Sequence, residues 1–400
     1  MIATLPGYSI DPRPILLCLS HLRWDFVFQR PQHLLSQAAT HYRVVFFEEP
    51  ITRPQPGAAP SLDLRRSAEG VLVATPVLPP GLDAAATDRA QREVLDALLA
   101  ELDAPVEVTW FYTPMALAFA GHLQPAVTVY DCMDELSAFR GASPRLALLE
   151  RQLLKRADLM FTGGRSLQEV KRRLHPRVHL FPSSVDAEHF RAARRGPDAP
   201  GSDPADQVGL PRPRIGFFGV IDERMDYDLI AAAAELRPDW QWVMIGPTAK
   251  VDTTALPNAA NLHWLGGKRY AELPSYLAGW DAGWMPFAMN EATRFISPTK
   301  TPEFLAAGVP LVSTPVPDVV ADWGKGGLVE IVDGPDAVVA AIEAVLARPP
   351  APWLARVDQR LASLSWAATW ARMAALIEEA ADHARPLPAS PPLEGSAQGL

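Results

Sequence analysis

The chain has 400 residues, of which 48% are hydrophobic and 21% are charged, and this length predicts two domains with separate cores. A net charge of −9 argues against general nucleic-acid binding. Two cysteines form neither a disulfide framework nor a zinc site, and no apolar run approaches the length of a membrane span. Residues 1–14 lack the basic start and apolar core of a signal peptide, so we expect a cytoplasmic protein.

Short apolar runs alternate with amphipathic stretches in the first half of the chain, which is typical of parallel strands joined by helices. We expect strands at residues 15–19, 44–48, 71–75, 106–112, 127–130, 159–162 and 178–181. We expect helices at residues 29–39, 86–102, 145–156 and 167–174.

A Pro-, Gly- and Asp-rich stretch at residues 192–213 interrupts this pattern, and the pattern then resumes. We expect strands at residues 214–218, 242–245, 262–265, 282–285, 311–313 and 328–332. We expect helices at residues 227–235, 270–278, 302–307, 337–347 and 366–381.

These elements predict an α/β protein of two Rossmann-like domains that face each other across a cleft. The predicted units are an N-terminal domain at 1–191, a linker at 192–213, a C-terminal domain at 214–364, a final helix at 365–384 and a disordered tail at 385–400. Ligands of such sheets bind beyond the carboxyl ends of the strands, so we expect the site in the cleft.

The segment 297–314, SPTKTPEFLAAGVPLVST, reads as a polar helix start, a short helix and a buried strand. Ser297 and Thr299 precede the helix, and Lys300 stands at its amino end. Unpaired backbone amides and partial positive charge at a helix start suit a diphosphate, and Lys300 adds a full charge. Glu303, one turn on, could accept hydrogen bonds from the two hydroxyls of a ribose. The alternative is that Glu303 only favours the helix dipole and Lys300 is solvated.

This segment resembles the donor-binding helix of the GT-B glycosyltransferases, in particular those similar to glycosyltransferase family 4. The resemblance implies that Lys300 binds the diphosphate and Glu303 the ribose of a nucleoside-diphosphate sugar. It also implies transfer to a hydroxyl with retention of configuration, and a final helix that packs back on the N-terminal domain. The chain departs from the family eight residues before Glu303, where Phe295 replaces a usual Glu; Glu291 is a candidate substitute for its contact with the donor sugar.

The segment 214–229 runs from a buried strand through Gly219 into a polar loop that contains Arg224. Gly219 would let the backbone approach a phosphate, and Arg224 could bind one through two hydrogen bonds. The alternative is a plain turn with a surface arginine. Gly246, Pro247 and Gly266 follow two further strands and resemble the base pocket of such enzymes.

The segment 19–33 follows the first strand and is rich in aromatic and polar residues. Its WDFVFQRPQH string is similar to one in bacterial transferases of teichuronic acid and exopolysaccharide synthesis, which implies a wall near the acceptor and the β-phosphate. The alternative is an aromatic clamp that packs the loop. The candidate residues, which we leave unranked, are His21, Arg23, Trp24, Asp25 and Arg30.

A further strand end, at residues 127–135, carries Asp131 and Asp134. Either carboxylate could bind acceptor hydroxyls or position a base, or Asp131 could simply cap a turn. We therefore count Asp131, Asp134, His21 and Asp25 as candidate catalytic residues.

We expect no metal and no cofactor, because the sequence offers no Mg²⁺ clamp or zinc spacing, and because Lys300, Arg224 and the helix start could neutralise a diphosphate. Residues 140–195 hold 13 Lys and Arg against 5 Asp and Glu. This segment is either ordinary solvated surface or a surface that attracts an anionic membrane carrying a lipid-linked acceptor.

The function predicted here is sugar transfer to a glycan or lipid-linked acceptor in cell-surface polysaccharide synthesis. Two alternatives remain: a GT-B nucleotide-sugar 2-epimerase, and a catalytically silent partner that binds a nucleotide-sugar or glycan. A dinucleotide dehydrogenase is disfavoured because neither half has a Gly-x-Gly-x-x-Gly after its first strand.

Overall fold

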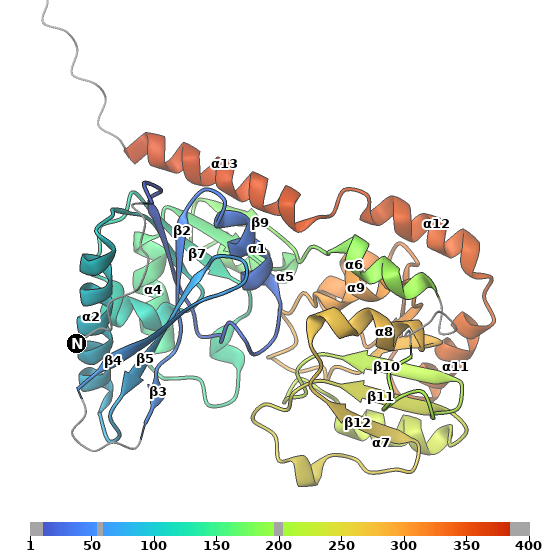
Figure 1. Ribbon diagram of the computed structural model, residues 1–400. Helices are drawn as coiled ribbons and strands as arrows, with labels where there is room; N and C mark the ends of the chain where they lie inside the picture. The colour runs from blue at the N-terminus through green and yellow to red at the C-terminus, as the bar shows by residue number, and fades with distance from the viewer. Residues whose placement is uncertain (1–10, 54–58, 196–202, 385–400) are drawn as a thin grey trace, which may run out of the picture.

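The computed structural model describes residues 11–53, 59–195 and 203–384, which form two α/β domains side by side (Figure 1). Each domain is a sheet of parallel strands with helices on both faces, as predicted. The predicted tail, 385–400, lies outside the described residues, and so does the part of the predicted linker at 196–202.

The N-terminal sheet has nine strands, and eight of them run parallel in the order β3-β5-β2-β1-β6-β7-β8-β9. The ninth, β4, pairs antiparallel with β5 at the edge. The strands are β1 (Ile15–Leu19), β2 (Arg43–Phe47), β3 (Ile51–Thr52), β4 (Ser61–Arg66), β5 (Leu72–Leu78), β6 (Val106–Phe111), β7 (Val127–Cys132), β8 (Leu159–Thr162) and β9 (Val178–Leu180).

Strand β1 shows why the strands of this sheet have continuous apolar sequences. Leu16 and Cys18 enter a core on one face, while Ile15, Leu17 and Leu19 enter a core on the other. A strand covered on both faces cannot alternate with polar residues. The helices of this domain are α1 (Arg30–Ala38), α2 (Ala84–Leu102), α3 (Leu117–Ala120), α4 (Leu146–Arg156) and α5 (Arg165–Lys171).

The C-terminal sheet has six parallel strands in the order β12-β11-β10-β13-β14-β15. The strands are β10 (Arg214–Phe218), β11 (Gln241–Ile245), β12 (Leu262–Gly266), β13 (Ala282–Met285), β14 (Leu311–Ser313) and β15 (Val329–Ile331). The helices are α6 (Ala187–Arg191), α7 (Tyr227–Leu236), α8 (Leu273–Ala278), α9 (Lys300–Ala307), α10 (Pro317–Val319), α11 (Pro335–Leu346) and α12 (Pro350–Leu361).

The chain enters the C-terminal domain earlier than the predicted boundary at residue 191. Val185, Phe190 and Ala193 already belong to the C-terminal core. The later part of the predicted linker is also packed there, since Gln207 is fully buried and accepts a hydrogen bond of 2.8 Å from the Trp280 indole. Residues 203–213 are therefore a packed part of the C-terminal domain and not a free linker.

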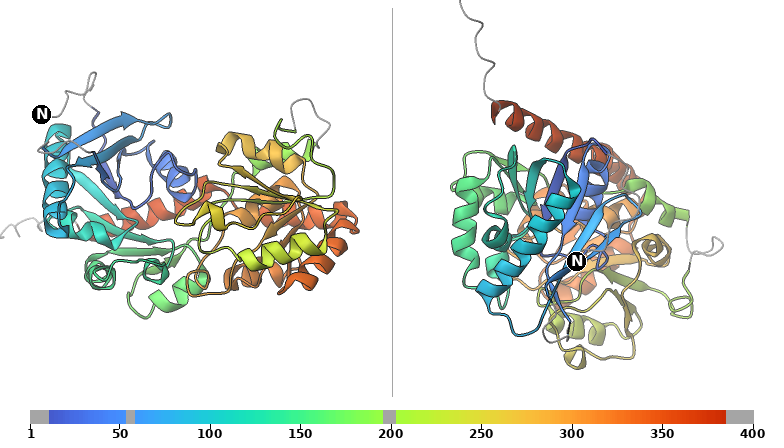
Figure 2. Two further views of the ribbon diagram at one scale, coloured as in Figure 1. Left: turned by 90° about the horizontal axis from the view of Figure 1, so that it is seen from below. Right: turned by 60° about the vertical axis from the view of Figure 1, so that its left-hand side comes forward.

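The last helix, α13 (Trp366–Ala384), returns to the N-terminal domain and lies along it (Figures 1 and 2). Trp366, Trp370, Met373 and Ile377 complete the N-terminal core beneath it. In the described part of the chain, no one helix has both the length and the apolar character to cross a membrane; the pair Pro335–Leu346 and Pro350–His383 meets that test only jointly and is bent by 100°.

Candidate functional site

A cavity of about 520 Å³ lies between the two domains at the carboxyl ends of both sheets. Its C-terminal wall contains six of the predicted residues, and its N-terminal wall contains three. The C-terminal set is Gly219, Arg224, Ser297, Thr299, Lys300 and Glu303, and the N-terminal set is His21, Arg30 and Asp134.

Helix α9 places the two central residues of the C-terminal wall. It begins at Lys300, two residues before the predicted start, and ends at Ala307; the capping residue is Gly308, whose φ of 78° suits a glycine. The Lys300 side chain lies against Gly219, where an added Cβ would overlap Lys300 Cε. The bare backbone of Gly219 therefore leaves room for the lysine to reach the cavity.

Burial dominates the electrostatics of this wall. It raises the pKa of Glu303 to about 8, although the nearby Lys300 charge opposes the shift. Burial, and then the charge of Arg224, lowers the pKa of Lys300. In the described part of the chain, the Glu303 carboxylate has no hydrogen-bond donor or ion-pair partner within bonding distance. A polyanion in the cavity would offset the repulsion between Lys300 and Arg224 and hold Lys300 protonated.

Arg224 is held in place by a neighbour in the same loop. Its guanidinium makes a two-pronged ion pair with Asp222, with Nη2–Oδ2 at 2.7 Å and Nε–Oδ1 at 2.9 Å. It also lies 5.8 Å from the centre of the Phe139 ring of the N-terminal domain. Arg224 thus faces the cavity already oriented, with part of its charge balanced by Asp222.

On the opposite wall, burial shifts the pKa values of two lining residues, Asp134 and His21. Burial raises the pKa of Asp134, while the positive charge of Arg224 acts in the opposite direction. Burial lowers the pKa of His21 to about 4, so its ring is neutral at pH 7. The His21 Nδ1 atom is buried without a hydrogen-bond partner.

A buried network supports the loop that carries Asp134. Lys171, which is 2% exposed, makes ion pairs with Glu135 at 2.8 Å and Glu150 at 2.6 Å. Tyr130 donates a hydrogen bond of 2.8 Å to the same Glu150 carboxylate. Because Glu135 adjoins Asp134 in the chain, this network fixes the position of the loop at the cavity wall.

The structure does not place Asp131 on the cavity wall. Both of its oxygens accept hydrogen bonds from Arg30, at 2.8 and 3.0 Å, and Arg30 also donates to the Phe181 carbonyl at 2.7 Å. Asp131 is fully buried. Arg30 lines the cavity with its charge compensated by Asp131, so this pair joins α1 to β7 and to the residue just after β9.

The aromatic segment after β1 is anchored by Glu48, a residue that sequence reasoning did not select. Glu48 accepts hydrogen bonds from the Trp24 backbone at 2.7 Å and from Arg23 at 3.2 Å. Trp24 is buried and its ring packs at 5.1 Å from Phe46. Asp25 is not on the wall of this cavity and pairs with Arg65 at 2.5 Å. Trp24 and Arg23 thus both contact Glu48, and these contacts fit the alternative of a packed loop.

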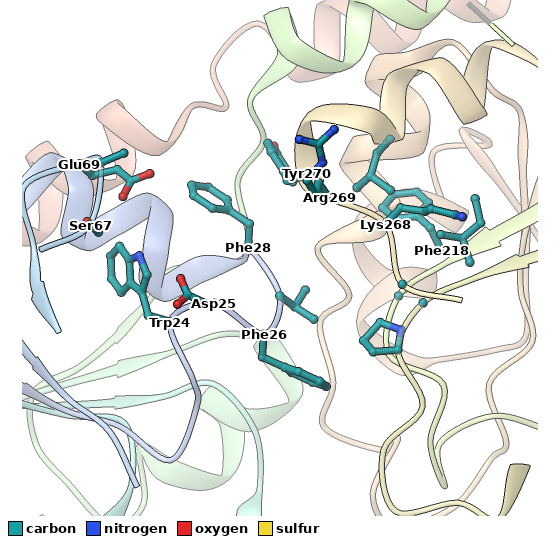
Figure 3. A pocket seen from close by; sticks show the side chains of 18 of the residues that line it. Trp24, Asp25, Phe26, Phe28, Ser67, Glu69, Phe218, Lys268, Arg269 and Tyr270 are labelled. Carbon is teal, nitrogen blue, oxygen red and sulfur yellow. The ribbon is translucent and has the colours of Figure 1, made fainter. Parts of the chain in front are cut away.

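A second cavity of about 620 Å³ adjoins the first (Figure 3). Gly246 and Pro247, two of the three predicted base-pocket residues, line it, together with Gly267 and Lys268. Gly266 lies just behind, where its carbonyl accepts a hydrogen bond of 3.0 Å from the Gly246 N–H. The opposite wall contains Trp24 to Phe28 and the β4–β5 turn. No sequence pattern indicated that the β4–β5 turn would line a cavity.

Glu291 and Phe295 lie apart from both cavities. The Glu291 side chain is 75% exposed and pairs with Arg294 at 3.8 Å, so the structure does not bring it to either cavity. Phe295, at the position of the usual family Glu, packs instead against an N-terminal core cluster. The residue that departs from the family pattern is thus a contact between the domains.

Sequence reasoning also missed Glu49, Thr113 and Lys250, which line the first cavity. Each of them follows the carboxyl end of a strand, so the rule that ligands bind at those ends could have indicated them. In the described residues, no group of His, Cys, Asp and Glu side chains has an arrangement that could hold a metal ion.

The fold and cavity define the two-domain GT-B class, and comparison with known proteins confirms this prediction. Sucrose-phosphate synthase from Thermosynechococcus elongatus superposes with a TM-score of 0.67 at 15% identity, covering 92% of this chain and 99% of that one. The trehalose-6-phosphate protein of E. coli, bound with UDP-2-fluoro glucose, gives 0.62 at 14% identity, with 92% and 99% covered. Anabaena HepE, in complex with UDP and glucose, gives 0.63 at 13% identity, with 92% and 99% covered.

Residues 212–348, most of the C-terminal domain, match the family model for glycosyl transferases group 1. The chain is also 30% identical over 236 residues to TuaH of Bacillus subtilis (strain 168), a protein assigned to teichuronic acid biosynthesis as a glycosyltransferase. That alignment covers 54% of this chain and 58% of the relative, so the chain matches little more than half of the relative's length.

Proposed function

We propose that this protein is a glycosyltransferase that moves a sugar from a nucleoside-diphosphate sugar to a hydroxyl group. The observation that carries the proposal is the donor wall of the first cavity. Lys300 at the start of α9, Arg224 and the buried Glu303 converge there, opposite His21 and Asp134 of the other domain. The family match of the C-terminal domain and the relatives' names support the same activity.

In this proposal Lys300, Arg224 and the amides at the start of α9 bind the diphosphate, with Ser297 and Thr299 beside it. Negative charge grows on the leaving diphosphate during transfer, and cations fixed in advance stabilise it where it develops. Glu303 accepts hydrogen bonds from the ribose hydroxyls. Asp134 and the neutral His21 face the transferred sugar and the acceptor, where both can form hydrogen bonds with hydroxyl groups.

Calorimetry with UDP-, GDP-, ADP- and dTDP-sugars tests the proposal. We expect one of them to bind the wild type and to bind Lys300→Ala at least tenfold more weakly, because a buried charge-assisted contact is lost. Lys325→Ala, at an exposed lysine of the same domain, is the matched control. Absence of binding by every nucleotide-sugar would refute the proposal.

The proposal also includes a role in cell-surface polysaccharide synthesis, with a glycan or lipid-linked molecule as the acceptor. It further includes transfer with retention of the anomeric configuration and no requirement for a metal ion. The name of TuaH supports the first point, and the cationic donor wall supports the last. Analysis of the product's anomeric configuration tests retention. Strict loss of turnover in EDTA, with rescue by Mg²⁺, would contradict the metal-free mechanism.

We also propose that α4 and α5 offer a surface for an anionic membrane. Much of the predicted basic segment is engaged, since Arg145, Arg165 and Arg177 pair with acids. Other exposed side chains remain in these helices and just after them: Arg151, Lys155, Arg172, Arg173, Leu148, Val170 and Leu174. Exposed cations beside exposed apolar groups suit a lipid surface. If the protein co-sediments with liposomes to the same extent whatever their anionic lipid content, the membrane proposal is contradicted.

A catalytically silent partner is the second candidate function. The observation that favours it is Phe295, which stands in place of the family Glu and packs between the domains. Such a protein would bind a nucleotide-sugar in calorimetry but give no turnover with any acceptor. A 2-epimerase would instead convert the sugar without an acceptor, so product analysis separates the three.

A further inference from the structure

Of the three aromatic rings in the segment after β1, only Phe26 makes no contact with another ring among the described residues. The Trp24 ring packs on Phe46 at 5.1 Å, and the Phe28 ring packs on Tyr270 at 4.9 Å. Phe26 makes no ring contact with any described residue and is 47% exposed, although it lines both cavities. An exposed phenyl ring at the meeting point of two cavities is unfavourable in the empty protein unless a ligand covers it.

The position of Phe26 is fixed by its neighbours. The Glu48 carboxylate accepts a hydrogen bond of 2.7 Å from the Trp24 N–H, and Gln32 donates one of 2.7 Å to the Trp24 carbonyl. The Phe26 N–H donates to the Arg23 carbonyl at 3.3 Å. The segment is thus held rigidly enough to present the ring in one place.

The second cavity continues from the donor wall without a gap. Gly219, which contacts Lys300, lines both cavities, and a Cβ on Gly246 would overlap the Gly219 carbonyl oxygen. Tyr270 also lines both, and Glu303 is close enough to help raise its pKa, although burial is the larger cause. A ligand with its diphosphate at Lys300 and its ribose at Glu303 therefore extends toward Gly246 and Gly267.

We propose that Phe26 of the N-terminal domain stacks on the nucleobase in this second cavity, so that the base is held between the two domains. Figure 3 shows the Phe26 ring reaching from the N-terminal segment toward the strand ends of the C-terminal domain. The glycines there leave the base a flat backbone wall on one side, and Phe26 supplies a flat apolar face on the other. This inference rests on the proposed function, because it assumes a nucleotide at Lys300.

Calorimetry with UDP, GDP, ADP and dTDP on the full chain tests the inference. We expect Phe26→Ala to bind the preferred nucleotide about five- to 100-fold more weakly, the range for the loss of one base–aromatic stack. Phe26→Trp should restore binding because it keeps an aromatic face. Met289→Ala is the matched control, since Met289 is 49% exposed and lines neither cavity. Inhibition of nucleotide binding by pyrophosphate should be equally strong in Phe26→Ala, because the diphosphate site is intact.

Four results would overturn the inference. If the wild type binds nucleotides and Phe26→Ala binds them equally well, the stack does not exist while the proposed function stands. If only the KM for acceptor changes, Phe26 belongs to the acceptor site. If pyrophosphate loses affinity as much as the nucleotide, the ring acts on the whole cleft and not on the base. A wild type that binds no nucleotide overturns both this inference and the proposed function. Thermal melting of Phe26→Ala, expected to match the wild type, excludes a folding defect.

Discussion

Glu303 is the residue at which binding and stability are most directly opposed. It is 6% exposed, and burial raises its pKa to about 8. At neutral pH the Glu303 side chain of the empty protein is therefore mostly the neutral acid. Two hydroxyl donors of a ribose would favour the ionised carboxylate, so the cost of burying its charge is relieved in the complex.

Glu303→Gln should remove a pH dependence of stability. The folded pKa lies above the usual value of 4.5, so the folded state binds the extra proton more tightly than the unfolded state does. This stabilisation is complete below about pH 4.5 and is lost as the pH rises to about 8. Relative to the wild type, Glu303→Gln should gain up to about 1.4 kcal/mol for each pH unit in that window. Urea unfolding at several pH values measures it, with exposed Glu235→Gln as the control; parallel pH curves for the two variants would contradict the expectation.

Asp131 is a candidate catalytic residue by sequence and an ion-pair partner by structure, and one substitution distinguishes the two. Asp131→Asn should lower the free energy of unfolding by about 3–5 kcal/mol, because it leaves the buried Arg30 without its counter-charge. Thermal and urea unfolding measure this loss. Asp333→Asn, at an exposed aspartate, should have no effect. A variant that keeps wild-type stability but loses turnover would return Asp131 to a catalytic role.

At the scale of elements, α5 and α10 form a contact that joins the domains at the floor of the cleft. Asp318 of α10 accepts a hydrogen bond of 2.9 Å from the Ser166 N–H near the start of α5. Asp322 pairs with Arg165 at 2.5 Å. The contact is possible because Gly164 has no side chain: a Cβ there would overlap the Asp318 carboxylate and lie 3.1 Å from Ser297 Cβ.

Gly164→Ala should therefore separate the two domains slightly and weaken the assembled site. We expect a larger radius of gyration by X-ray scattering, and at least a tenfold loss of kcat/KM once a substrate is known, because misplacing reacting groups by about 1 Å costs that much or more. Gly209→Ala is the control, since a Cβ there meets nothing within 4 Å. An unchanged radius of gyration together with unchanged kinetics would show that the contact is not needed for closure.

At the scale of the whole molecule, the N-terminal domain is assembled from both ends of the sequence. Helix α13 places Trp366 and Trp370 in the core of that domain, and the Trp366 ring stacks on His33 of α1 at 4.7 Å. The chain thus crosses between the domains twice, near residue 185 and again near residue 365. The C-terminal domain is consequently a continuous stretch between two segments of the N-terminal domain.

Trp370→Ala tests this dependence. Trp370 is 4% exposed and lies 6.2 Å from Trp110, so its removal should leave a cavity and cost about 3–5 kcal/mol. We expect the N-terminal domain to unfold less cooperatively. Hydrogen exchange of the backbone amides in β6 and β7 measures this loss. Glu378→Ala on the exposed face of α13 should leave exchange unchanged. Protection in β6 that survives Trp370→Ala would mean that the domain is stable without this helix.

The strands buried on both faces were predicted closely, because their apolar runs depend only on local composition. Strands β1 and β10 have the predicted bounds. Strand β4 was missed because it lies at the sheet edge, and most of its side chains are exposed, so it shows no apolar run. Helix α12 was missed although it buries Trp353 and Val357, because its start is Pro-rich and reads as a loop.

The sequence by itself determined the central part of the C-terminal cavity wall, because Lys300, Glu303 and the start of α9 lie within one continuous segment whose local helix geometry fixes their relation. Only the tertiary structure decided which residues face that wall. Asp134 reaches the cavity and Asp131 pairs with Arg30, although both are carboxylates at the end of one strand. Phe26 lines both cavities and is about half exposed, whereas Glu291 lies in solvent. The reason is physical: contacts between residues a hundred or more positions apart depend on how two sheets and their crossover segments pack, and no local pattern records that packing.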